Sequence, residues 1–213
     1  MTITTIVNLA EHWDDAHDQG TRPTCLAFTL SELNRRAYGT QQLSAEYLYR
    51  AAAQLSADWT PGGGLMLSHA GQALGASGQP SSASCPYCED EPAESPPTLP
   101  DFDADESFYR NAISRLPIEL TAISKIFALG PVGLIVRITE SFFDPVDGVI
   151  AYADQTVKGM SHAVVATGYG SDENGLEYLR IRNSWGVEWG DAGYAWLPMD
   201  YVLAHAAAAF HID

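Results

Sequence analysis

Apolar residues at helical spacing predict a helix that begins at Cys25 and ends before Gly39. The apolar face of this helix is formed by Leu26, Leu30, Leu33 and Ala37. Thr24 is the candidate N-cap, and Gly39 is the kind of residue that ends a helix. The pattern therefore places Cys25 at the N-terminus of an amphipathic helix.

Two further helices are predicted downstream. Ser44 is a candidate N-cap for a helix that runs to about Leu55, and residues 68–74 form a third helical stretch after a glycine-rich turn. We therefore expect residues 1–88 to form one helical lobe.

The second half of the chain alternates as strands do. The predicted strands are residues 132–138, 163–169, 176–183 and 193–197. Side chains repeat every two residues in a strand, so Asn183 shares the buried face with Leu179 and Ile181. A buried amide needs a polar partner, so we expect a polar group opposite Asn183. Residues 107–213 are predicted to be a β-rich lobe.

Residues 89–106 separate these halves and differ from both in composition. The segment holds eight acidic residues, four prolines and no lysine or arginine. Because proline excludes regular helix and central strand, we expect a solvated connector between the two halves of one domain, residues 1–213.

Net charge and the length of apolar runs argue against nucleic-acid binding and membrane functions. The 213 residues carry a net charge of −16, which argues against partners such as nucleic acid or an anionic membrane. The N-terminal residues lack a secretory signal pattern, and no apolar run is long enough to span a bilayer. We expect a cytoplasmic protein as synthesised, with signal-less export as an alternative.

Four residues supply the groups that cysteine acyl transfer requires. Cys25 is a candidate nucleophile because a helix N-terminus favours a thiolate. His162 lies 137 residues after Cys25, within the separation of about 130–150 residues known for cysteine nucleophiles and their bases, and is the candidate base. Asn183, 21 residues further on, is its candidate orienting partner. Gln19 is a candidate oxyanion donor.

The sequence around these residues resembles the papain-like cysteine peptidases. The matching blocks are residues 18–20 with 25–28, 161–170, and 183–186 with 189–194, in the family's order. The resemblance implies an α+β fold with two lobes, a helical lobe packed on a β-barrel-like lobe, and an active-site cleft between them. It also implies that Cys25 and His162 form a thiolate–imidazolium pair.

The resemblance extends to substrate-binding positions. Gly63 and Gly64 match the segment that pairs with substrate backbone, and Trp185 matches a residue that shields the His162–Asn183 bond. The positions that match the second specificity pocket are Met66, Met160 and Ala163. Two methionines would suit an apolar side chain, although core filling is the alternative for both.

The chain departs from the family pattern near the nucleophile. The family usually has Cys-Gly-Ser-Cys-Trp, whereas this chain has Arg22-Pro23-Thr24-Cys25-Leu26, and Pro61 stands where the disulfide partner would be. Both halves of that disulfide are missing, which fits a reducing compartment. Leu26 and Ser161 also alter the surroundings of the nucleophile and the base.

Other reactive side chains have weaker signals. Cys85 and Cys88 form a Cys-x-x-Cys, but the acidic residues and proline that follow disfavour redox catalysis, and two ligands are too few for structural zinc. The remaining histidines are predicted as surface or packing residues: His12, His17, His69, His205 and His211.

The sequence therefore predicts a cysteine peptidase that uses no cofactor and no metal, and that acts through a Cys25 thioester. An acyl transferase or peptide ligase with the same residues is one alternative, and a catalytically silent peptide-binding module is another. The expected partner is a protein or peptide substrate, with an inhibitory or activating protein as a further candidate.

Overall fold

A computed structural model describes residues 2–11 and 13–213, so His12 and its predicted role lie outside the described residues. The chain divides into two compact units. The sheet unit contains residues 1–18 and 114–211, and the helical unit contains residues 19–113 and 212–213. The sheet unit thus includes the N-terminal segment, which we expected in the helical lobe.

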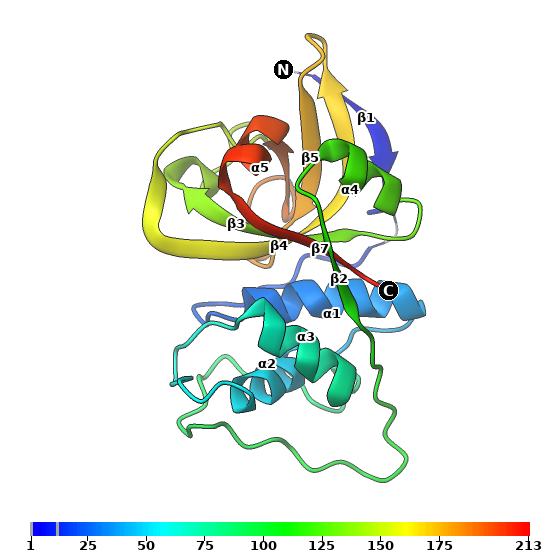
Figure 1. The fold of residues 1–213 in the computed structure, drawn as a ribbon, viewed down its shortest axis with the longest axis vertical. Coiled ribbons are helices and arrows are strands. Elements are labelled where there is room, and N and C mark those ends of the chain that lie inside the picture. The colour runs from blue at the N-terminus through cyan, green and yellow to red at the C-terminus, as the bar shows by residue number, and fades with distance from the viewer. Residues whose placement is uncertain (1, 12) are drawn as a thin grey trace. The chain divides into compact units, whose positions relative to one another are not determined.

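Three helices form the framework of the helical unit (Figure 1): α1 (Cys25–Tyr38), α2 (Ala45–Gln54) and α3 (Leu67–Ala76). Gly39 ends α1 in the left-handed conformation, with φ of 59°. The Ser44 hydroxyl caps α2 by accepting a hydrogen bond from the Tyr47 N–H at 3.0 Å. All three predicted helices are confirmed within about two residues at each end.

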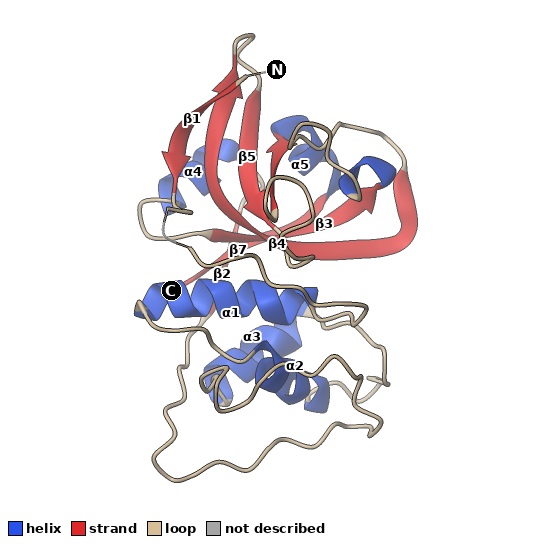
Figure 2. Cartoon of the chain, turned by 180° about the vertical axis from the view of Figure 1, so that it is seen from behind, coloured by secondary structure: helices blue, strands red, loops and turns tan. Residues whose placement is uncertain are grey.

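The segment between α3 and the next strand is a long loop in the helical unit (Figure 2). The prediction that residues 89–106 lack helix and strand is confirmed, and most residues of the segment are exposed. The segment lies within the helical unit. Phe102 packs edge-on against Tyr47 and Phe108, at centroid distances of 5.4 and 5.3 Å, and Glu91 bonds to Arg22. Phe102 and Glu91 thus attach an otherwise exposed segment to the helical unit.

The sheet unit is built on a seven-stranded antiparallel sheet. Its strands are β1 (Ile3–Asn8), β2 (Ile113–Leu116), β3 (Val132–Thr139), β4 (Thr156–Asp172), β5 (Glu177–Arg182), β6 (Tyr194–Pro198) and β7 (Ala206–Ile212). The strand order is β2-β7-β3-β4-β5-β6, and β1 pairs with β4. No pairing in the described chain joins β2 to β6, so the sheet is open and the barrel is incomplete.

Two short helices complete the core of the sheet unit. Helices α4 (Leu120–Ile126) and α5 (Met199–His205) contribute Ile123, Tyr201 and Val202 to the same apolar cluster as β3, β4 and β5. A single turn of 3-10 helix, Glu140–Phe142, follows β3. No described helix is both long and apolar enough to cross a membrane.

Strand β4 pairs with three other strands of the sheet, β1, β3 and β5. Its first part pairs with β3, with His162 opposite Val136, and its last part pairs with β5 and β1 (Figure 1). At Gly168 the backbone of β1 approaches so closely that an added Cβ would lie 2.1 Å from the Val7 carbonyl oxygen. A residue without a side chain is therefore required for β1 to pair here.

Candidate active site

The predicted site residues fall in both units. The helical unit holds Gln19, Cys25, Gly63, Gly64 and Met66. The sheet unit holds Met160, His162, Ala163, Asn183 and Trp185.

In the sheet unit, His162 and Asn183 form a direct hydrogen bond. His162 lies in β4 and Asn183 follows the last residue of β5, so two neighbouring strands bring them together. The distance from His162 Nε2 to Asn183 Oδ1 is 2.6 Å, and both side chains are buried. The polar partner predicted for Asn183 is therefore His162.

The Ser184 backbone fixes the direction of this bond. Its N–H donates to the same Oδ1 of Asn183 at 2.8 Å, so that atom must be the carbonyl oxygen of the amide. An oxygen can only accept, and Nε2 of His162 therefore carries a hydrogen. In the neutral ring, Nδ1 is then the basic nitrogen.

Aromatic rings surround the His162–Asn183 pair. The Trp185 ring lies 4.5 Å from the His162 ring between centroids, and Phe142 meets His162 edge-on at 5.8 Å. Phe143 stacks on Trp185 at 5.6 Å with an interplanar angle of 9°. The shielding position that the resemblance implied for Trp185 agrees with this packing, whereas no sequence pattern indicated Phe142 and Phe143.

Burial controls the charge of the imidazole. Desolvation lowers the pKa of His162 from 6.5 to about 4, and the hydrogen bond that His162 donates to Asn183 opposes this effect only in part. The neutral imidazole is therefore the stable form of His162 near neutral pH unless a negative charge faces it.

In the helical unit, Cys25 is the first residue of α1 and is half-buried. Thr24 occupies the N-cap position, but its side chain makes no capping hydrogen bond, in contrast to the prediction. Its hydroxyl instead lies 2.9 Å from the Tyr87 hydroxyl. The backbone N–H groups of the first turn of α1 thus have no acceptor from the Thr24 side chain.

Gln19 is held beside this helix start by its own loop. Its Nε2 donates to the Arg22 carbonyl at 2.7 Å, and its backbone carbonyl accepts from the Tyr87 hydroxyl at 2.7 Å. Tyr87 was not predicted as a site residue.

The two predicted substrate-pairing glycines differ in their backbone contacts. The Gly63 carbonyl accepts from Trp59 Nε1 at 3.1 Å and lies 2.7 Å from the Tyr49 hydroxyl, and the Gly63 N–H donates to the Thr60 carbonyl. Within the described residues, the Gly64 N–H and carbonyl make no hydrogen bond. Gly64 is therefore the one of the two whose backbone can pair with a peptide.

The residues predicted for the second specificity pocket divide by exposure. Met66 is 62% exposed and Met160 is 42% exposed, so neither fills a core. Ala163 is 2% exposed, because it lies in β4 opposite Ile135 of β3. The core-filling alternative for the two methionines is thus wrong.

The remaining cysteines lie in a loop of the helical unit. All three cysteines are free thiols, and burial raises the pKa of Cys85. A buried thiol that is harder to ionise is the opposite of a redox nucleophile. Across residues 2–11 and 13–213, no three His, Cys, Asp or Glu side chains form a group that could hold a metal ion.

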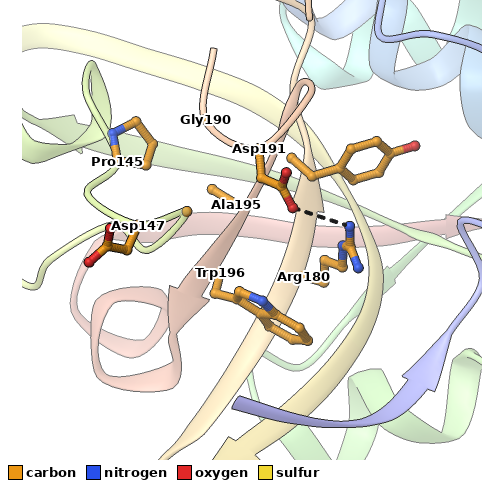
Figure 3. A pocket seen from close by; sticks show the side chains of 9 residues that line it. Pro145, Asp147, Arg180, Gly190, Asp191, Ala195 and Trp196 are labelled. Atoms are coloured by element: carbon orange, nitrogen blue, oxygen red, sulfur yellow. Dashed lines mark ion pairs between the residues drawn. The ribbon is translucent and has the colours of Figure 1, made fainter. Parts of the chain in front are cut away.

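A pocket of about 400 Å³ lies elsewhere in the sheet unit (Figure 3). Arg180 faces Asp191 across it at 3.9 Å, and Trp196 and Pro145 contribute to its walls. None of the predicted site residues lines this pocket. The residues predicted to carry out the reaction therefore lie outside this pocket.

Comparison with known proteins decides the family. A profile described as papain family cysteine protease matches residues 18–208, which is most of the chain. The chain belongs to the papain family of cysteine proteases. The match includes every residue predicted for the site.

Individual relatives match shorter regions. Cathepsin L of Sarcophaga peregrina is 36% identical over 70 residues, which cover 32% of this chain and 21% of that protein. Pro-cathepsin H of Mus musculus is 34% identical over 91 residues, which cover 41% of this chain and 27% of that protein. The chain thus matches about a quarter of the length of these curated relatives.

Solved structures support the fold over the whole chain. Xylellain, a cysteine protease from Xylella fastidiosa, has a TM-score of 0.81 at 21% identity and covers 100% of this chain and 87% of its own. A cysteine protease of Carica candamarcensis in complex with E-64 has a TM-score of 0.75 at 21% identity, over 99% of this chain and 98% of its own. The papain-like α+β fold predicted from the sequence is confirmed.

Proposed function

We propose that this chain is a cysteine peptidase in which Cys25 is the nucleophile and His162 the acid and base. The observation that carries the proposal is the His162–Asn183 hydrogen bond, which leaves Nδ1 of the ring as the proton-accepting nitrogen. The position of Cys25 at the N-terminus of α1 supports its role, because the helix dipole favours a thiolate.

The proposed reaction begins with attack of the Cys25 Sγ thiolate on the carbonyl carbon of a peptide bond. The oxyanion that forms accepts hydrogen bonds from the Gln19 side-chain amide and the Cys25 backbone N–H, each worth roughly 3 kcal/mol in comparable sites. The carbon–nitrogen bond then breaks, and the imidazolium of His162 gives its proton to the leaving amine. A thioester to Cys25 and a free amine result.

Water completes the cycle. Nδ1 of His162 takes a proton from water as the oxygen attacks the thioester carbon. The carbon–sulfur bond breaks, the carboxylic acid product leaves, and the proton on His162 again faces a thiolate. Asn183 keeps the ring oriented through both steps, because its Oδ1 accepts from Nε2 in either protonation state.

The charge states of Cys25 and His162 depend on each other. Burial alone keeps His162 neutral, with its pKa lowered to about 4. An imidazolium is therefore stable only when the thiolate of Cys25 supplies the counter-charge, which couples the two ionisations. A neutral thiol and a neutral imidazole are the competing state of the resting enzyme.

The proposed substrate is a protein or peptide. Gly64 offers backbone groups for an extended chain, and the exposed side chains of Met66 and Met160 suit an apolar residue near the scissile bond. Ala163 is not proposed as a direct contact, because its side chain is buried.

Intact-mass spectrometry with an epoxide inhibitor such as E-64 tests the proposal. We expect one adduct on the wild type, none on Cys25→Ala, and one on the double variant Cys85→Ala/Cys88→Ala. Unlabelled wild type with a thiol open to iodoacetamide would reject the peptidase. Labelling without peptide hydrolysis, but with transfer to an added amine, would instead support the ligase alternative.

A further inference from the structure

A buried arginine lies three residues before the proposed nucleophile. The Arg22 side chain is 2% exposed, yet it belongs to a loop. Its Nη1 lies 2.5 Å from Glu46 Oε2, and its Nε lies 3.0 Å from Glu91 Oε2. Nη1 also donates to the Cys88 carbonyl. Helix α2 and the loop at residues 88–91 thus meet at one guanidinium.

Two aromatic rings complete the surroundings of this guanidinium. The Arg22 Cζ lies 5.0 Å from the centroid of the Tyr49 ring and 5.0 Å from that of the Tyr87 ring. Both distances fall within the range of cation–π attraction. Arg22 is therefore held by charge, by hydrogen bonds and by ring contact at the same time.

The two glutamates that pair with Arg22 each have a further hydrogen-bond donor. Arg50 Nε lies 2.7 Å from the second carboxylate oxygen of Glu46, and the Tyr49 hydroxyl donates to Glu91 at 2.8 Å. Burial disfavours the Arg22 cation, but the hydrogen bonds and charges of the two glutamates outweigh it and raise its pKa. The guanidinium remains charged at all working pH values.

The same cluster contacts the residues proposed to hold the oxyanion. The Arg22 carbonyl accepts from Gln19 Nε2, and the Tyr87 hydroxyl donates to the Gln19 carbonyl. Because that hydroxyl has only one hydrogen, Thr24 must donate to Tyr87 at 2.9 Å. Arg22 and Tyr87 thus hold the Gln19 side chain, the Gln19 carbonyl and the residue directly before Cys25.

We infer that Arg22 is a positioning residue for the oxyanion site. Its buried side chain anchors residues 19–25 so that the Gln19 amide and the Cys25 N–H keep one geometry. The resemblance places half of a disulfide at this position in the family, and here an ionic and aromatic anchor stands in its place. The inference rests on the proposed peptidase function.

Arg22→Met and Arg22→Lys, measured for peptide hydrolysis and for alkylation by iodoacetamide, test this inference. Alkylation needs the thiolate but no oxyanion site, because the reaction displaces iodide at a saturated carbon. We expect Arg22→Met to lower kcat roughly 10- to 100-fold with KM nearly unchanged and alkylation of Cys25 near the wild-type rate. Arg22→Lys, which keeps the charge but not the planar fork, should recover part of kcat.

Two variants separate positioning from general stability. Arg35→Met removes a buried arginine of α1 that pairs with Glu32 at 3.1 Å, and it should lower the melting temperature without changing kcat. Tyr87→Phe removes one hydroxyl and leaves no buried charge without a partner. It therefore tests the same contacts to Gln19 and Thr24 if Arg22→Met does not fold. It should lower kcat and leave alkylation unchanged.

The outcomes are distinguishable. If Arg22→Met and Tyr87→Phe keep the wild-type kcat, or if Arg22→Met slows alkylation as much as hydrolysis, the positioning role is wrong while the peptidase remains. If the wild type neither hydrolyses peptides nor reacts with the epoxide, the proposed function fails and the positioning role fails with it.

Discussion

His162 Nε2 and Asn183 Oδ1 lie 2.6 Å apart, and the Ser184 N–H donates to the same oxygen at 2.8 Å. Two donors thus fix one carbonyl oxygen, and that oxygen fixes the tautomer of the imidazole. The catalytic proposal depends on this relationship, because it leaves Nδ1 as the nitrogen that exchanges protons.

Asn183→Ala should lower kcat/KM roughly 10- to 100-fold, since a hydrogen bond to a group that becomes charged is worth about 1.5–3 kcal/mol. Steady-state hydrolysis of a peptide substrate measures the change. Asn34→Ala is the control, because it removes a buried amide that bonds Gln79 and the Tyr109 carbonyl in the helical unit. The control should lose stability and keep kcat/KM; equal loss of activity in both variants would contradict the orienting role.

The stability of the sheet unit should depend on pH through His162. The pKa of His162 is about 4 in the folded chain and 6.5 in the reference state, so the unfolded chain binds the proton more tightly. Stability from neutral His162 is therefore complete above about pH 6.5 and is lost as the pH falls toward 4. The loss reaches about 2 kcal/mol at pH 5, from about 1.36 kcal/mol per pKa unit.

Urea unfolding at pH 7.5 and pH 5 measures the contribution of His162 to this pH dependence. The two variants compared are Cys25→Ser and Cys25→Ser/His162→Leu. The serine removes the thiolate, and the second variant removes the titrating ring, so other acidic groups cancel in the comparison. An equal loss of stability in the two variants would show that His162 is not the group responsible.

Trp185→Leu should raise the pKa of His162 from about 4 toward 6.5, because the Trp185 ring covers the imidazole at a centroid distance of 4.5 Å. Titration of the ring protons by NMR in the Cys25→Ser background measures it. Trp59→Leu, in the helical unit, is the matched control and should leave the titration of His162 unchanged. An unchanged pKa in Trp185→Leu would mean that other residues keep water from the ring.

Gly168→Ala should separate β1 from β4, because the added methyl would lie 2.1 Å from the Val7 carbonyl oxygen. We expect a loss of about 1–3 kcal/mol of unfolding free energy. Gly130→Ala is the control, since nothing lies within 4 Å of its added Cβ. Thermal unfolding of both variants measures the difference in stability. Similar melting temperatures would contradict the close approach of the Val7 carbonyl to Gly168.

The parts of the molecule that could be predicted are those with a local signal. Helix α1 and its start at Cys25 follow from apolar spacing and a terminal glycine. The burial of Asn183 follows from the alternation along β5. The four catalytic candidates follow from residue types and long separations, which the family resemblance made specific.

The parts that could not be predicted depend on contacts between distant residues. Strand β7 begins with four alanines, which favour helix, yet it pairs with β3, where Gly133 leaves space for the Phe210 ring. The Thr24 side chain bonds to Tyr87 instead of capping α1, across 63 residues of sequence. Tertiary packing overrides local preference at both places, and neither has a sequence pattern of its own.

The measurement that tests the central claim most directly is the rate of Cys25 alkylation by iodoacetamide as a function of pH, in the wild type and in His162→Ala. The account predicts that the wild type reacts at pH 5 nearly as fast as at pH 7, because the imidazolium of His162 keeps the thiolate present. In His162→Ala the rate should fall about tenfold per pH unit below about 8.5, as for an ordinary thiol. The same steep fall in the wild type would show that Cys25 and His162 form no ion pair, and would contradict the account.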